Sequence, residues 1–390
     1  MKIVITTKDE FAKYANYYQE SEPLFLDPDG TRTRFPIGWK GVGRYLPGTL
    51  QVYTASGEKV SGITEEDGGV FFNFTSAPSA GSYKDYVVKY VPRPDDVAFS
   101  KGLSNSSFPG EEYFLFPNWI DGPGIGDAFW IGKYQASRSD ATTTSQGSST
   151  ILASRKNVCP VTNVAFSTWN TLISNKGSRF HQITNREWSN VILWSLKMGI
   201  KITGNCYGYV NSSYVNIDGE GTNMTQYPAD GYYKTRTGMG PTTWNHNGLE
   251  GGIADMCGNV WEATDGLKLV NNVIYIFDND TDKNWVSTGV AYSGNLITNS
   301  NGTSFGNTLY YPTDSDLWKE MIPCNASGKE TITAYGDDGT WFASGERILY
   351  RGGICSYGSL AGVFAFNVDD AVSSSFSSSW SGCRLCVKLL

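Results

Sequence analysis

The chain has 390 residues, which is enough for two or three domains with complete hydrophobic cores. Its net charge is −7 at pH 7 and it has no basic run, which argues against a nucleic-acid partner held through phosphates. Gly (44), Tyr (23) and Trp (12) are abundant while charged residues are 18%, a balance typical of a loop-rich globular protein with an adaptable binding surface.

The seven cysteines follow no regular spacing, and their odd number leaves at least one thiol unpaired, so we expect reduced and mostly buried side chains. Cys383 and Cys386 form a CxxC. Because positions i and i+3 of an alternating strand point to opposite faces, this motif predicts neither a redox pair nor a chelate. No segment approaches the length of a membrane span, and Met1 to Thr7 lacks the apolar run of a Sec-type signal peptide, so we expect no membrane insertion.

Residues 1–95 are predicted to form a small β-rich domain. Thr7 and Glu10 form a capping box before a short amphipathic helix that ends before Pro23. Strand-like runs punctuated by Gly, Pro and Asp follow at 50–54, 69–75 and 86–91. A proline-rich stretch then opens a linker expected over 96–127. We hypothesise that the N-terminal domain is an attachment module.

Residues 128–390 are predicted to form one larger domain that opens with a strand at 128–135. Two amphipathic helices follow, and each is expected to end at the next glycine. The first is expected to be capped by Asn163, and the second to begin with the capping box of Thr184 and Glu187. Their aromatic stripes are interpreted as core.

Two long stretches without periodicity, 200–250 and 279–344, indicate large loop insertions in this domain. The serine-rich stretch at 373–381 would be a flexible tail if the chain ended there. Residues 381–390 instead alternate like one half-buried strand, with one face formed by Cys383, Leu385, Val387 and Leu389. The serines are therefore interpreted as a loop between anchored elements.

Five motifs follow one another in this domain, at Phe129–Ser137, Ile183–Trp188, Gly258–Glu262, Arg351–Gly353 and Gly382–Arg384. In this order they resemble the formylglycine-generating-enzyme (sulfatase-modifying factor) version of the C-type lectin fold. The third motif matches Gly-Asn-Val-Trp-Glu in full, whereas Ile183 and Asn185 depart from the pattern of the second. The resemblance implies an α+β protein, in which a C-type lectin fold with long loop insertions over 128–390 follows the small β-rich domain.

Three further features resemble, within that group, the variable proteins that retroelements diversify. They are Asn245–Gly248, an Ala-Gly-x-Phe-Ala-Phe pattern at 361–366 and an Ala-x-Ser-x-Ser pattern at 371–375. The resemblance implies a variable region at about 351–384 that presents a hypervariable binding surface, with Tyr357 and Phe376 as its aromatic anchors. The residues implied as ligand contacts are Cys355, Ser356, Tyr357, Leu360, Val363, Asn367, Val368, Asp369, Asp370, Phe376 and Ser378.

This resemblance implies a receptor-recognition protein on a virion attachment structure or at a cell surface. Its expected partner is a surface protein or glycan of a host or neighbouring cell. The resemblance implies no required cofactor and no catalytic activity. Two alternatives are an oxidase like the formylglycine-generating enzyme and a structural virion protein whose C-terminal loop is incidental. The oxidase binds copper through two cysteines after Arg-Gly-Gly, where this sequence offers only Cys355.

The chain has two histidines, His181 and His246, and both are interpreted as structural, although a Ser-His-Asp triad that uses either stays open. The resemblance also implies one structural calcium ion, held through oxygen ligands of Asn259, Val260 and Glu262. An equally good interpretation is that these residues brace the core. The alternating carboxylates at 278–282 are interpreted as a solvated turn, because the glycine of a calcium-binding loop is missing after them.

Overall fold

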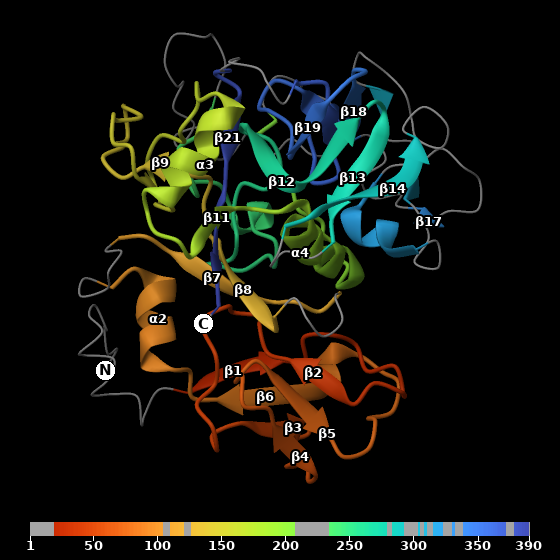
Figure 1. Cartoon of the computed structure of the whole chain (residues 1–390). Helices are drawn as coiled ribbons and strands as arrows, with labels where there is room; N and C mark the ends of the chain where they lie inside the picture. Colours follow the sequence, from red (N-terminus) through yellow and green to blue (C-terminus); the bar gives the residue numbers. More distant parts are fainter. Residues whose placement is uncertain are drawn as a thin grey trace. The chain divides into compact units, whose positions relative to one another are not determined.

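The computed structural model describes residues 19–103, 110–120, 126–206, 234–278, 283–291, 303–304, 308–309, 315–322, 330–331, 338–371 and 378–389. The fold combines a few helices with mostly antiparallel sheets, which confirms the α+β class. No helix within these ranges is long and apolar enough to cross a membrane. The chain divides into two compact units, residues 1–131 with 389–390 and residues 132–388 (Figure 1).

The first unit contains two three-stranded antiparallel sheets. One has the order β1-β6-β3, with strands Glu20–Pro23, Tyr86–Tyr90 and Gln51–Thr54. The other has the order β2-β5-β4, with strands Arg34–Pro36, Phe71–Phe74 and Ile63–Glu65. A short 3-10 helix, η2 (Tyr83–Asp85), precedes β6. The described residues therefore confirm the β-rich character of this region, while the helix predicted after Thr7 lies outside them.

The segment expected as a linker carries structure of its own, with α2 (Pro94–Lys101) and β7 (Tyr113–Pro117) inside the first unit. Pro94 starts the helix rather than blocking it, because the first helical turn has no N–H hydrogen bond to lose. Asp96 then connects α2 to Arg44, whose Nε lies 2.8 Å from Asp96 Oδ2. β7 is buried at every residue and pairs with β8 (Ala128–Gly132).

The second unit is built on one large sheet with the order β14-β13-β12-β19-β20-β18-β15, and β21 lies beside β12 (Figure 1). The strands are Trp285–Ala291 (β14), Val273–Phe277 (β13), Trp261–Val270 (β12), Arg347–Arg351 (β19), Phe366–Val368 (β20), Gly339–Phe342 (β18), Thr303–Ser304 (β15) and Ser381–Cys383 (β21). Asn271 and Asn272 join β12 to β13, and both have the positive φ that a tight hairpin turn requires.

The helix α4 (Asn185–Lys197) lies against β12 and begins as predicted. Glu187 N donates to Thr184 Oγ1 at 3.1 Å, and Thr184 N donates to Glu187 Oε2 at 2.8 Å, which confirms the capping box. Trp188 is fully buried, as the aromatic stripe predicts. This helix therefore has the start and the buried face that its sequence indicates.

The helix α3 (Phe166–Ser174) has its expected buried face, including Trp169, but not its expected start. It begins after Ala165, and no side chain caps it. The predicted cap at Asn163 is wrong because that residue adopts a left-handed conformation with φ of 59°, before the helix begins. An asparagine can adopt this conformation as readily as it can cap a helix, so the residue type alone did not decide between them.

The last strand also differs from the expectation of one alternating strand over 381–390. β21 pairs in parallel with β12, whereas β22 (Leu385–Lys388) pairs antiparallel with β11 (Phe180–Gln182), so the chain changes partners at Arg384. Cys386, which lies on the opposite face from Cys383 in the expected alternation, is also fully buried, because both faces of β22 are covered. A half-buried alternation was therefore the wrong interpretation.

Short elements complete the second unit. They are β9 (Ser137–Arg138), β10 (Leu152–Ala153), η3 (Thr242–Trp244), β16 (Thr308–Leu309), η4 (Ser315–Glu320), β17 (Glu330–Thr331) and η6 (Gly358–Leu360). The stretch predicted as the second loop insertion, 279–344, thus contains several strands, among them β14, β15 and β18 of the central sheet. All six cysteines in the described ranges are buried thiols outside disulfides, which agrees with the prediction of reduced side chains.

Candidate functional site

Arg351, at the end of β19, is a fully buried structural cation. Its Nε donates to Asn185 Oδ1 at 3.0 Å, and its Nη2 donates to the backbone oxygens of Glu320 (2.8 Å) and Met321 (3.2 Å). Asn185, which departs from the resembled motif, also donates to Glu320 Oε2 at 2.7 Å. One arginine therefore connects β19, α4 and η4. It fixes the start of the predicted variable region, residues 351–384, which we call the C-terminal segment.

Arg384 fixes the other end of that segment through a buried, bidentate ion pair. Its Nε and Nη2 donate to Glu262 Oε2 and Oε1 at 2.8 and 2.7 Å. Its Nη1 and Nη2 also donate to the backbone oxygens of Gly132 (2.9 Å) and Ala254 (2.8 Å). Because both charged groups are fully buried and their hydrogen bonds are made, the pair holds the junction of β21 and β22 against β12.

The oxygens expected to bind calcium already accept hydrogen bonds from the protein. Asn259 Oδ1 accepts from Thr235 N at 2.8 Å, and Val260 O accepts from Gln135 Nε2 at 3.1 Å. Both carboxylate oxygens of Glu262 accept from the guanidinium described above, which already neutralises their charge. These contacts give no support to a calcium ion, because the one carboxylate in the set is already paired with a buried cation. The alternative interpretation, that they brace the core, agrees with their burial.

Three of the eleven predicted ligand contacts are core residues. Cys355 is 1% exposed, and Val363 and Val368 are 0% exposed. They were wrong as surface contacts. Val368 lies on β20, an interior strand whose residues are all buried, whereas Val363 O accepts from Trp188 Nε1 and Cys355 N donates to Asn259 O within the core. Leu360 is half-buried at the end of η6, and Phe376 lies outside the described residues.

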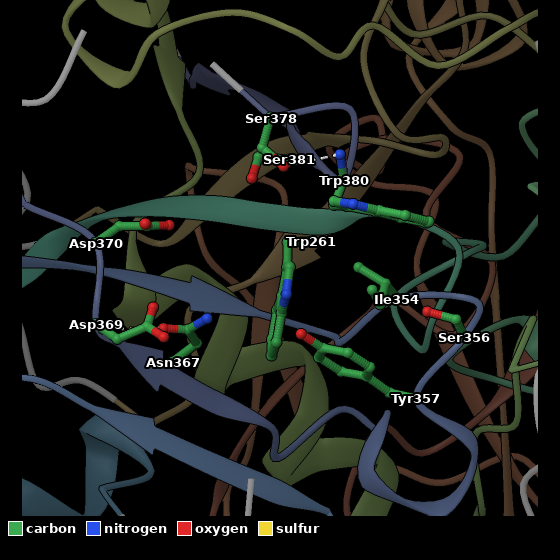
Figure 2. A pocket seen from close by; sticks show the side chains of 10 residues that line it. All are labelled: Trp261, Ile354, Ser356, Tyr357, Asn367, Asp369, Asp370, Ser378, Trp380 and Ser381. Carbon is green, nitrogen blue, oxygen red and sulfur yellow. Dashed lines mark hydrogen bonds between the residues drawn. The ribbon is translucent and has the colours of Figure 1, made fainter. Parts of the chain in front are cut away.

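Six of the predicted contacts line one cavity of about 280 Å³ in the second unit, which we call the C-terminal hollow (Figure 2). They come from the turn after β19, from the end of β20 and from the turn before β21. These six are Ser356, Tyr357, Asn367, Asp369, Asp370 and Ser378. The rest of the lining consists of Trp261, Ile354, Trp380 and Ser381. The fold thus brings together side chains from both ends of the segment that the sequence singled out.

One side of the hollow is a rigid aromatic cluster. The ring of Tyr357 stacks on Trp341 of β18 with centroids 4.9 Å apart and planes 21° apart. Trp261 meets both rings edge to face, at 5.1 Å from Trp341 and 5.9 Å from Tyr357. Trp380 makes a separate cation–π contact, with Lys234 Nζ 4.5 Å from its ring centroid. A ligand would meet aromatic faces that are already fixed, so little side-chain entropy is lost on binding.

The polar side of the hollow carries two adjacent carboxylates that are poorly solvated. Burial raises the pKa of Asp369, and burial together with the neighbouring Asp369 charge raises the pKa of Asp370 to about 6. The nearby Arg347 donates from Nη1 to the backbone oxygen of Asp369 at 2.8 Å, and from Nε to Ser344 O. Asn367 Oδ1 accepts from Asp369 N at 2.9 Å. The backbone around the carboxylates is therefore held in place while their oxygens line the cavity.

No family model matches the chain, and no curated protein matches it significantly. The interpretation of the hollow therefore rests on its own geometry. Sequence reasoning missed Trp261 and Trp380 as lining residues, although each is a large aromatic within or beside a motif of small residues. Trp380 was the more accessible signal, because it interrupts a run of serines. No such signal marked Trp261, because the motif that contains it is interpreted equally well as part of the core.

The structure also reveals a thiol pair that the sequence did not indicate. Cys206 and Cys257 are both fully buried, with their sulfur atoms 3.9 Å apart. The hydrogen bond with Cys206 and burial raise the pKa of Cys257 well above its usual value. Cys257 is therefore held as a protonated thiol, and neither cysteine lies in the segment after Arg-Gly-Gly where the oxidase alternative requires its ligands.

His246 is a buried, neutral side chain. Its Nδ1 accepts from Ile253 N at 2.9 Å, and burial lowers its pKa to about 3. Ser195, the hydroxyl close to it, donates to the backbone oxygens of Val191 and His246 at 3.0 and 2.8 Å. These contacts are those of a core residue, so they give no support to a triad built on His246.

Proposed function

We propose that this protein is a ligand-binding, receptor-recognition protein that binds through the C-terminal hollow. We further propose that residues 128–390 adopt the C-type lectin fold of the formylglycine-generating type, with a hypervariable surface of the kind that retroelements diversify. The observation that carries the proposal is that six of the residues selected from the sequence pattern, which lie apart along the chain, line one cavity. An incidental loop would give no reason for these side chains to converge.

The chemistry of the hollow indicates what it binds. Trp261, Tyr357 and Trp380 offer aromatic surface. Asp369 and Asp370 offer hydrogen-bond acceptors whose burial is only partly offset by neighbouring side chains. A ligand that suits this lining presents an apolar face together with hydrogen-bond donors. A surface protein or glycan of a host or neighbouring cell can offer both.

The proposed contact set is narrower than the one the sequence implies. It consists of Ser356, Tyr357, Asn367, Asp369, Asp370 and Ser378 with Trp261 and Trp380 beside them. Sequencing the 3′ end of the gene from several isolates tests the hypervariable part of the proposal. Substitutions are expected to concentrate at the codons of the six predicted contacts in this set and to spare those of the buried Val363 and Val368. A uniform spread of substitutions along the chain would argue for an ordinary structural protein.

Binding itself can be tested with arrays of purified glycans and with a displayed peptide library. We expect at least one probe that binds the full-length protein and is lost in Tyr357→Ala and in Asp370→Asn. Ile151→Ala is the matched control, because Ile151 is an exposed apolar residue far along the chain from the lining and absent from it. If bound probes respond equally to all three substitutions, or to none, the hollow is not the binding site.

A further inference from the structure

Three metal-ligating side chains meet in the second unit, and none of them lines the hollow. His181 on β11 lies directly opposite Cys386 on β22, so the two side chains share one face of this antiparallel pair. Glu187 reaches them from the first turn of α4, and its Oε1 lies 2.8 Å from His181 Nε2. One donor atom of each residue lies within 4.8 Å of the other two.

The tautomer of His181 decides which of its ring nitrogens can face an ion. His181 Nδ1 is a buried atom that has no hydrogen-bond partner among the described groups. Since Nε2 faces Glu187 Oε1 at 2.8 Å, an ion bound between these two atoms takes the lone pair of Nε2, and the ring proton then lies on Nδ1. Glu187 Oε2 is held by Thr184 N at 2.8 Å, which fixes the carboxylate while Oε1 faces the imidazole. The cluster is therefore ordered but incompletely satisfied.

We propose that His181, Glu187 and Cys386 bind one divalent transition-metal cation of the zinc class. Thiolate, imidazole and carboxylate are the donors that zinc takes in proteins, whereas calcium and magnesium take oxygen. The thiolate and the carboxylate carry two negative charges, which the dication balances, so the occupied site adds no net charge to the interior. Zinc–ligand distances of about 2.0 to 2.3 Å place ligand atoms roughly 3 to 4 Å apart, so side-chain shifts on the order of 1 Å close the cluster.

The surroundings leave room for a fourth ligand and for the charge of the cation. The side chain of His181 is 11% exposed against 5% for Glu187, so water reaches the cluster from the histidine side. Lys283 also acts on the charge of Glu187, but its Nζ is already paired with Asp265 Oδ2 at 3.2 Å. An ion held here would connect β11, α4 and β22, and would therefore stabilise the folded second unit as a structural metal does.

The test is cobalt and zinc binding to the full-length protein after treatment with a chelator. We expect Co²⁺ to produce the near-ultraviolet charge-transfer absorption of a thiolate ligand, and Zn²⁺ to abolish it by displacement. The metal should bind with one equivalent more in the unmodified protein than in Cys386→Ser. His181→Gln should weaken the affinity roughly tenfold or more. Zn²⁺ should also raise the melting temperature of the unmodified protein but not that of His181→Gln.

The control is Cys206→Ser, which removes one member of the other buried thiol pair and leaves the cluster intact. It should keep the cobalt absorption of the unmodified protein. If Cys386→Ser does not fold, His181→Gln decides the question, because His181 is the more exposed of the pair with Glu187 and glutamine keeps a polar side chain of similar size. Absorption that survives in either variant, or that is lost in Cys206→Ser, overturns the assignment. So does an unmodified protein in which Co²⁺ produces no thiolate absorption.

Discussion

The two ends of the C-terminal segment and the hollow between them treat their charged groups in opposite ways. Arg351 and Arg384 are fully buried, and protein acceptors surround each guanidinium. Asp369 and Asp370 are half-buried, and burial raises their pKa because Asn367 and Arg347 compensate it only in part. Complete pairing marks the parts of the segment that hold the fold, and incomplete pairing marks the part left available to a ligand.

The largest expected effect comes from breaking the pairing at one end. Arg384→Ala should lower the free energy of unfolding by about 3 to 5 kcal/mol, because it leaves the Glu262 carboxylate buried without its cation. Denaturant unfolding followed by tryptophan fluorescence measures the change. The control is Lys268→Ala, which removes an ion pair to Glu346 whose side chains are 21% and 50% exposed and should cost less than about 1 kcal/mol. Equal costs for the two substitutions would contradict the contrast drawn above.

A smaller effect is expected at Gly353, which has φ of 79° and whose added Cβ would come within 2.6 Å of Ala361 Cα. Gly353→Ala should cost about 3 kcal/mol, of which about 1 comes from the left-handed backbone and the rest from the backbone that must shift. Gly248→Ala separates these terms, since Gly248 has φ of 68° and open space around the added atom. It should cost only about 1 kcal/mol. A Gly353→Ala variant no less stable than Gly248→Ala would remove the case for a close approach there.

The predicted contacts themselves should divide by burial. Val368→Ala should lower the free energy of unfolding by about 2 kcal/mol, because Val368 lies in the apolar cluster of the central sheet. Ser356→Ala, on the lining of the hollow, should change it by less than about 0.5 kcal/mol. Thermal melting of both variants measures this difference in stability. A stable Val368→Ala protein would mean that β20 is less tightly packed than the structure indicates.

The smallest effect is a pH dependence of stability from Asp370. Its pKa is about 6 in the folded protein, against roughly 4 for an unfolded carboxyl, so the folded state holds the proton more tightly. The stabilisation is fully present below about pH 4 and is lost as the pH rises through about 6. The melting temperature of Asp370→Asn relative to the unmodified protein should therefore rise by a few degrees at most over that range. A difference that stays constant with pH would show that burial does not act on this carboxyl.

Local chemistry explains what the sequence predicted correctly. The Thr184 capping box involves residues three apart, so its two hydrogen bonds are visible in the sequence and appear in the structure. The β-rich character of the first unit likewise follows from short runs between turn residues. In contrast, Asn163 offered two local options, cap or left-handed turn, and no neighbour along the chain distinguishes them.

What the sequence could not predict depends on contacts between distant residues. Val363 and Val368 look like variable surface positions until β20 is seen to lie between β19 and β18. The lining residue Trp261 and the stacking partner Trp341 lie on β12 and β18, which come before the predicted contacts in the sequence. The pairing of His181 with Cys386 is a matter of register between β11 and β22, which no pattern within either strand reveals.

The change of strand partners at Arg384 has a consequence for how the protein is made. β12 and β11 cannot complete their hydrogen bonds until residues 381–388 have left the ribosome, because β21 and β22 supply the partners. Contacts between such distant residues form late in folding, since long loops must close first. We therefore expect a truncated polypeptide to leave these strand edges open to proteolysis and aggregation. Only a chain translated through residue 388 would complete the partners of β11 and β12.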